Sequence, residues 1–130
     1  MSLIRSCLAG IAPTAVASLT AALAGAGCQL PLIADGVNIT QLGLSRPDLL
    51  VADIDDLELD PIEMLRMTRF VLPNCMIAVY TDKRSLAWVR ACHIAGANCV
   101  LSKESGKAAL VVGLKRTLSV GCFTDPKFAA

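Results

Sequence analysis

The sequence is poor in charge over its first quarter, in histidine and in aromatic residues. Residues 6–34 contain no Lys, Arg, Asp or Glu, although charged residues make up 18% of the 130-residue chain. His93 is the only histidine, and Phe, Trp and Tyr supply 4% of the residues. With 12 basic and 11 acidic residues, the formal net charge is +1. The chain therefore lacks the basic surplus of a nucleic-acid-binding domain, and we expect no direct contact with DNA.

The charge-free stretch has three interpretations. A transmembrane helix needs about 20 apolar residues, but this stretch contains Pro13, several glycines and many weakly apolar alanines. Arg5, followed by an Ala/Leu-rich run and small residues near Ala24, would suit a secretory signal. We favour the third interpretation, a buried first strand and an unusually apolar first helix of a cytoplasmic domain. On this interpretation we expect no membrane partner.

A Cys-x-x-Cys pair is also missing among the six cysteines. An even count would suggest disulfides in a secreted chain. Most of these cysteines lie in apolar runs such as residues 98–101, where a free cysteine behaves as a small hydrophobic residue. One histidine and no thiol pair at ligand spacing make a zinc site unexpected. We expect buried, reduced cysteines, as is usual in the cytoplasm.

Short apolar runs alternate with longer helical patterns along the chain, and no repeat or long linker divides it. We predict strands at 3–9, 29–34, 49–52, 76–80 and 99–101, and helices at 13–24, 37–45, 61–70, 85–95 and 106–120. Parallel strands need crossover connections, so this alternation predicts a parallel sheet with helices on both faces. The length fits one such α/β domain.

Sheets of this kind carry their sites at the carboxyl ends of the strands. This rule selects Gly10 and Ile11 after the first strand, Asp53 after the third, Thr81 after the fourth and Lys103 after the fifth. A carboxylate can accept a phosphoryl group as an acyl phosphate, and a hydroxyl and an ammonium can bind its oxygens. The combination therefore suits a phosphoryl group.

These residues, in this order, resemble bacterial response-regulator receiver domains of two-component systems, and the resemblance covers the whole chain. Segment 47–53 looks like the third strand with its phosphoacceptor aspartate, and 60–65 follows in register with the usual Asp-Gly-(Leu/Ile)-Glu-Leu-Leu, with proline for glycine. Segment 77–81 matches the fourth strand with its switch hydroxyl, and 95–103 matches the Ala-Gly-Ala stretch, fifth strand and lysine. The resemblance implies a flavodoxin-like (CheY-like), doubly wound sheet of five parallel strands in the order 2-1-3-4-5. It also implies that Asp53 is the phosphoacceptor and that Thr81 and Lys103 contact the phosphate.

The C-terminal residues 101–105 and 121–130 are similar to regulators of the NarL/FixJ (LuxR) type. There a Gly-x-x-x-(Ser/Asp)-Pro-x-x-Ala-x linker leads to a helix-turn-helix output domain. The resemblance implies a receiver domain at 1–120 and the start of this linker at 121–130, so that DNA would be reached only through a C-terminal domain outside this chain. It also implies a homodimer formed by the fourth helix, fifth strand and fifth helix, with Trp88, His93 and Val100 on the candidate face.

The chain departs from the receiver pattern where metal is bound. Receivers hold a divalent cation, normally Mg²⁺, with an acidic pair after the first strand, the phosphoacceptor and a backbone carbonyl. The acidic pair falls on Gly10 and Ile11 here, and the aromatic that moves with the switch hydroxyl falls on Val100. Because Mg²⁺ needs oxygen ligands, we expect weak or no metal binding and no other cofactor. Asp55 and Asp56 follow a different strand and are poor replacements.

We therefore expect a degenerate receiver that is not an enzyme. It would regulate by dimerisation or protein contact, with Asp53 and Lys103 as a structural ion pair. The closest alternative is a conventional receiver whose Asp53 is phosphorylated by a partner histidine kinase. More remote alternatives are a small flavodoxin-like enzyme that uses a cysteine or a flavin, and a secreted or membrane protein.

Overall fold

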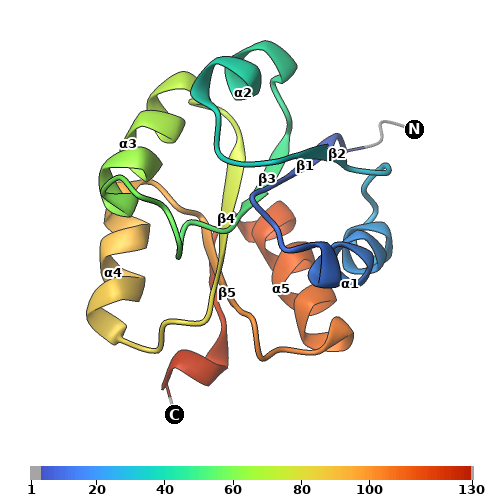
Figure 1. Ribbon diagram of the computed structural model, residues 1–130. Helices are drawn as coiled ribbons and strands as arrows, with labels where there is room; N and C mark the ends of the chain where they lie inside the picture. Colours follow the sequence, from blue (N-terminus) through green and yellow to red (C-terminus); the bar gives the residue numbers. More distant parts are fainter. Residues whose placement is uncertain (1–3, 130) are drawn as a thin grey trace.

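Six parallel strands form one sheet with helices on both faces in the computed structural model, which describes residues 4–129 (Figure 1). The strands are β1 (Ser6–Ala9), β2 (Leu32–Ala34), β3 (Leu49–Ala52), β4 (Met76–Thr81), β5 (Cys99–Ser102) and β6 (Phe123–Thr124). The helices are α1 (Pro13–Gly25), α2 (Ile39–Ser45), α3 (Pro61–Val71), α4 (Leu86–Ala95) and α5 (Lys107–Val120), followed by a short 3₁₀ helix, η1 (Pro126–Ala129).

The strand order is β2-β1-β3-β4-β5-β6. The sheet thus has six strands, one more than the five that the sequence predicts. The order of the first five strands is the expected one. The sixth strand pairs in parallel with β5 through Cys99 and Val100 and lies in the segment where a linker is expected. A two-residue strand is too short to show a periodic pattern, so this pairing has no signal in the sequence.

The strands occur where apolar runs are covered on both faces. Every residue of β1, β3 and β5 is buried, as is typical of parallel strands beneath two helical layers. The predicted first strand begins at residue 3, which lies outside the described residues; Ile4 forms an isolated bridge to Cys28, and β1 starts at Ser6. The predicted second strand, 29–34, shortens to β2 because Pro31 has no N–H to donate to a sheet.

Local signals account for the helix ends. Proline occupies the first turn of α1 and of α3, where its missing N–H costs nothing. Asp60 caps α3 by accepting the Ile62 amide at 3.0 Å, and Ser85 caps α4 by accepting the Trp88 amide at 3.3 Å. Gly96 ends α4 with φ +125°, and a Cβ there would lie 2.8 Å from the Arg69 side chain. Glycine is therefore required at position 96.

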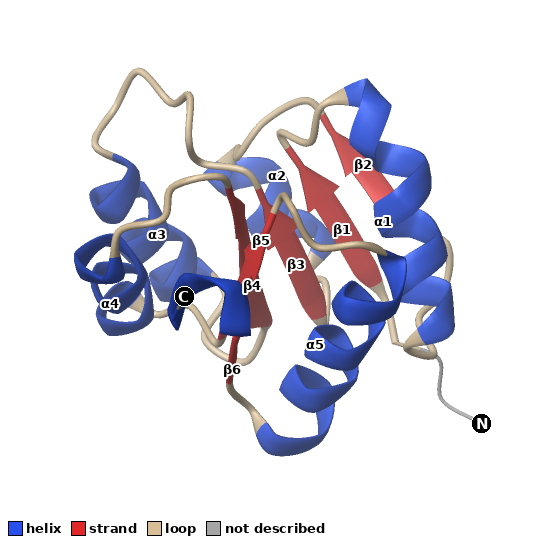
Figure 2. Ribbon diagram, turned by 90° about the horizontal axis from the view of Figure 1, so that it is seen from below, coloured by secondary structure: helices blue, strands red, loops and turns tan. Residues whose placement is uncertain are grey.

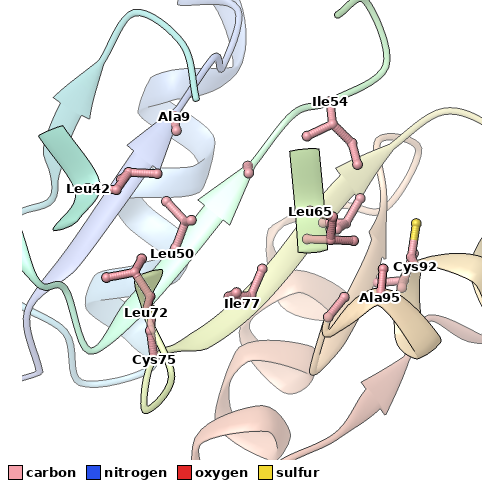
Figure 3. Packing of buried hydrophobic residues seen from close by; sticks show 14 of the residues in the cluster. Ala9, Leu42, Leu50, Ile54, Leu65, Leu72, Cys75, Ile77, Cys92 and Ala95 are labelled. Carbon is pink, nitrogen blue, oxygen red and sulfur yellow. The ribbon is translucent and has the colours of Figure 1, made fainter. Parts of the chain in front are cut away.

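Helices lie on both faces of the sheet (Figure 2), and the sheet separates two hydrophobic clusters. One lies between the sheet and α2, α3 and α4, where Leu42, Leu65 and Cys92 meet strand residues such as Leu50 and Ile77 (Figure 3). The other lies between the sheet and α1 and α5, and its helical members are Leu19, Ala22, Leu23, Leu110 and Leu114. The strand residues contribute alternately to both clusters, so the sheet is the shared centre of the core.

The charge-free residues 6–34 form β1, α1 and β2. Leu19 and Leu23 of α1 are fully buried, while the exposed positions of the helix carry small residues such as Thr14, Ala17 and Ser18. Charge is therefore missing here for two reasons: strand residues and one helix face are buried, and the exposed face is built from Ala, Ser and Thr. No helix among residues 4–129 has the length and apolar character needed to cross a membrane.

Residues 121–129 pack onto the domain next to β5. The buried Asp125 carboxylate accepts hydrogen bonds from the Ser102 amide at 3.2 Å and from the Ser105 hydroxyl. Phe128 is 4% exposed and joins the cluster beneath α4. The Lys127 ammonium donates to the Glu104 carbonyl at 2.8 Å. This segment is thus held against the loop that carries Lys103.

Candidate functional site

The carboxyl ends of β3, β4 and β5 bring the predicted site residues to one edge of the sheet. The ladder pairs Ala52 with Val79 and Thr81 with Ser102 in register. Asp53 and Lys103 follow directly after their strands, so they meet at the level where Thr81 ends β4. Parallel strands place such residues together because all of them end at the same edge.

The Lys103 ammonium bridges two carboxylates. It lies 2.7 Å from Asp53 Oδ2 and 3.0 Å from Asp55 Oδ2. The Asp53 side chain is 11% exposed, that of Asp55 5% and that of Lys103 24%. Asp53 Oδ1 also accepts the Asp55 amide at 3.0 Å, which fixes the turn after β3. One cation and two anions therefore occupy a half-buried site with a net charge of −1.

Asp55 belongs to the site, although its position in the sequence did not indicate this. Its Oδ1 accepts the Thr81 hydroxyl at 2.6 Å, and its Oδ2 accepts the Asp82 amide at 3.0 Å in addition to Lys103. The acidic run at residues 53–60 signalled a charged loop. It gave no indication which carboxylate turns inward, because loop side chains follow no period.

The ionisation of this group follows from its contacts. Burial alone would raise the pKa of Asp55, but hydrogen bonds from Thr81, the Asp82 amide and Lys103 outweigh it and lower the pKa below its ordinary value. Burial alone would lower the pKa of Lys103, yet its contacts with Asp53 and Asp55 raise the pKa above the ordinary value. The charged forms of both partners are thus favoured together.

Gly10 and Ile11 lie at the end of β1, next to this group. Gly10 has φ +69°, and a Cβ there would come within 3.0 Å of the Asp53 carbonyl oxygen. A side chain at this position is therefore strained as well as crowded. Ile11 packs against the cluster beneath α1 and α5. Neither residue supplies an oxygen ligand from its side chain.

A hollow of about 190 Å³ lies beside Asp53, lined by Gly10, Asp35, Gly36, Asp53, Asp56 and Leu57. Within residues 4–129, no three His, Cys, Asp or Glu side chains come together as a metal-binding group. Asp53 and Asp55 both contact Lys103 instead. This donor set does not fit the near-octahedral oxygen shell that Mg²⁺ requires.

Thr81 connects the site to α4. While its hydroxyl donates to Asp55, its oxygen accepts the Lys83 amide at 3.1 Å and the Trp88 indole N–H at 3.2 Å. The Lys83 ammonium lies 4.0 Å from the centroid of the Trp88 ring, as in a cation–π contact. The indole is therefore positioned by two residues at the end of β4.

The three residues of the candidate dimer face differ in accessibility. Trp88 is half-buried at the start of α4. His93, also half-buried, contacts the Ala97 carbonyl through Nδ1 and the Thr124 hydroxyl through Nε2, at 2.9 and 2.8 Å. Val100 is fully buried, because α3 and α4 cover the face of β5 from which its side chain projects. Its side chain is therefore removed from the candidate face.

The six cysteines are free thiols, and four of them are buried: Cys7, Cys75, Cys92 and Cys99. Burial raises the pKa of Cys75, Cys92 and Cys99 to about 12. The thiolate is the nucleophilic form, so these three side chains are poor nucleophiles near neutral pH.

No protein-family model and no curated protein sequence matches the chain. Among solved structures, it is similar to the RcsB response regulator of Salmonella typhimurium, with a TM-score of 0.82 and 17% identity over 99% of this chain and 65% of that one. The chain thus spans less than two thirds of RcsB. A LuxR-family two-component response regulator from Aurantimonas sp. SI85-9A1 has a TM-score of 0.76 and 21% identity, covering 98% of this chain and 94% of its own.

The chemotaxis protein CheY4 of Vibrio cholerae matches 88% of this chain and 98% of its own length, with a TM-score of 0.75 and 16% identity. These structural neighbours are response-regulator proteins or CheY-like receivers. The likeness shows that the chain has the CheY-like receiver fold.

Proposed function

We propose that the chain is the signal-receiver module of a transcriptional response regulator and that it acts through protein contact, independently of Mg-dependent phosphorylation. The receiver fold supports the first part. The observation that carries the second is the Lys103 ammonium bridging Asp53 and Asp55. The lysine neutralises charge that a divalent cation would otherwise neutralise, and Gly10 and Ile11 offer no side-chain oxygen to hold one. Mg²⁺ binding is accordingly weak or absent.

The module is not an enzyme in this proposal. It belongs to the NarL/FixJ (LuxR) type, with a receiver at 1–120 and the start of a linker at 121–130. Contact with DNA then requires an output domain beyond this chain, as the reported DNA interaction of the longer RcsB regulator would suggest by analogy. The module works in the cytoplasm.

The contact surface in this proposal is a homodimer face on α4, with Trp88 as its anchor. A half-buried aromatic side chain is well suited to this role because it adds large buried area at low entropic cost. The indole is already held by Thr81 and Lys83, so little of its freedom remains to be lost on association. His93 lies farther along the same helix and joins α4 to β6.

Incubation with acetyl phosphate and Mg²⁺, followed by intact-mass measurement, tests the proposal. We expect no stable mass gain, because Asp53 is paired with Lys103 and the metal ligands are missing. A receiver that carries the acidic pair, treated in parallel, controls for active reagent. A gain of one phosphoryl group that disappears in Asp53→Asn would instead support a conventional receiver that a histidine kinase phosphorylates.

A further inference from the structure

Three donors at the ends of β4 and β5 converge on one carboxylate. Asp55 receives the Thr81 hydroxyl on Oδ1, and it receives the Asp82 main-chain amide and the Lys103 ammonium on Oδ2. The three contacts measure 2.6, 3.0 and 3.0 Å, and the Asp55 side chain is 5% exposed. The donors come from two strand ends, and the acceptor comes from the loop after a third.

A hydroxyl, a main-chain amide and an ammonium form a donor set suited to an anion. Each presents a proton to an oxygen, and the ammonium adds a positive charge at hydrogen-bond distance. Any oxyanion with two or more free oxygens can satisfy such a set, whether it diffuses in or belongs to the chain. Here two carboxylate oxygens of Asp55 take all three donors.

We propose that Asp55 is an internal ligand: its carboxylate fills an anion site made by Thr81, the Asp82 amide and Lys103, and so keeps external oxyanions out. The proposal rests on the proposed function in that it concerns the regulation of the same site. Two effects exclude an added anion. The donors are already used, and the carboxylate repels a second negative charge at short range.

The hydroxyl of Thr81 links Asp55 to α4 through hydrogen bonds. A threonine hydroxyl can donate one hydrogen bond and accept two. Thr81 donates to Asp55 and accepts the amide of Lys83 and the indole of Trp88, so its capacity is fully used. With its proton committed to Asp55, the oxygen lone pairs must point toward Lys83 and Trp88. Asp55 therefore helps to orient the indole of α4 without touching it.

Asp56 provides a matched comparison. It follows Asp55 directly in the same acidic loop and carries the same charge, but its side chain is exposed. In the part of the chain that the structure describes, the Asp56 side chain accepts no hydrogen bond from the Thr81 hydroxyl, the Asp82 amide or the Lys103 ammonium. A variant at position 56 therefore changes the net charge as a variant at position 55 does, without emptying the site.

The test is titration with inorganic phosphate, followed by the NMR signals of the Asp82 amide and the Trp88 indole N–H. Two double variants are compared, Asp53→Asn/Asp55→Ala and Asp53→Asn/Asp56→Ala, which have equal formal charge. Both lack the Asp53 carboxylate, which would otherwise repel phosphate in either protein. We expect saturable binding to the first, tighter than to the second by roughly tenfold or more. Thermal unfolding of both variants establishes that they are folded.

Equal phosphate affinity in the two double variants would overturn the proposal, because the effect would then be one of net charge. Failure of the Asp55 double variant to bind phosphate, although folded, would also overturn it. Wild-type protein supplies a test that requires no variant: phosphate should leave both signals unchanged, and a saturable shift would contradict a filled site. Failure of the proposed function is distinguishable, because it appears as a covalent mass gain on Asp53 and not as reversible phosphate binding.

Discussion

Lys103 shares its ammonium between two carboxylates with different surroundings. Asp53 also accepts a main-chain amide of its own turn, whereas Asp55 also binds Thr81 and Asp82 from the neighbouring strand end. The lysine therefore joins the ends of β3 and β5, and the contacts of Asp55 with Thr81 and Asp82 add the end of β4. Removing the cation would leave two carboxylates close together in a half-buried place, which is costly.

The pKa of Asp55 makes stability depend on pH in a defined direction. The unfolded chain takes up this proton near an ordinary pKa of about 3.9. The folded chain keeps the carboxylate charged to lower pH, because hydrogen bonds lower its pKa despite burial. At Asp55 the unfolded state then binds more protons, so the contribution of Asp55 to the free energy of unfolding should fall as pH decreases below about 4. The neighbouring Asp82, whose pKa the hydrogen bond with Asp55 raises, contributes in the opposite direction. Urea unfolding at a series of pH values would measure this slope.

The control for that slope is a pair of amide variants in one loop. Asp55→Asn should make the free energy of unfolding depend less steeply on pH in acid, because an amide at position 55 does not titrate. Asp56→Asn removes an exposed carboxylate that contacts neither Thr81 nor Lys103, and the wild-type slope should remain. Identical slopes in wild type and Asp55→Asn would show that Asp55 is not the group responsible.

At the scale of elements, the C-terminal segment behaves as part of the sheet. β6 adds a strand to the sheet by pairing in parallel with β5. The Phe123 amide donates to the Asn98 carbonyl at 2.9 Å, and the Asp125 amide donates to the Val100 carbonyl at 3.0 Å. The buried Asp125 carboxylate then joins this segment to Ser102 and Ser105, on either side of Lys103. Movement of this segment would therefore displace the loop that carries Lys103.

Asp125→Ala should release this segment. The substitution leaves the Ser102 amide and the Ser105 hydroxyl without their acceptor, which costs about 1–3 kcal/mol for buried donors. Hydrogen exchange of the Phe123 and Asp125 amides should become faster, while amides of β1 and β3 keep their protection. Lys127→Ala, which removes an exposed contact in the same segment, serves as the control and should have a smaller effect. Unchanged exchange at position 123 in Asp125→Ala would contradict the role of the carboxylate.

Several elements could be predicted from the sequence because burial imposes a pattern there. The run at 49–52 predicts β3 with its observed bounds, and the proline and cap residues predict the start of α3. The convergence of Asp53 and Lys103 follows from strand order alone. Asp55 and β6 could not be predicted, since the direction of a loop side chain and a two-residue pairing depend on tertiary contacts. Val100 was misplaced on the candidate dimer face because helices cover both faces of this sheet, so a side chain on β5 is buried on whichever face it lies.

For the molecule as a whole, the sheet couples its two clusters. Each central strand sends alternate side chains to both, as Leu50 and Val51 do in β3. Neither cluster can lose its strands while the other stays intact, so the domain should unfold in one cooperative step. Trp88 packs against one cluster, so its fluorescence reports on α4, whereas far-UV circular dichroism reports on all helices.

The two signals should give the same urea midpoint and the same dependence on denaturant. The comparison is sharpest because Trp88 is the only tryptophan, so no second indole contributes. An earlier fluorescence transition would mean that α4 and its neighbours unfold separately from α1 and α5. That result would contradict a core organised around one shared sheet.

The contact between Asp55 and its three donors determines how long the anion site has a ligand. An acyl phosphate ends by hydrolysis, so a site that depends on one is filled for a limited period. The Asp55 carboxylate is joined to the backbone by carbon–carbon bonds, so it cannot diffuse away from the three donors. Under the proposal above, the ligand that fills this site remains available for as long as the polypeptide exists. The rates of synthesis and degradation, and not those of a kinase and a phosphatase, would then set how much of this state a cell contains.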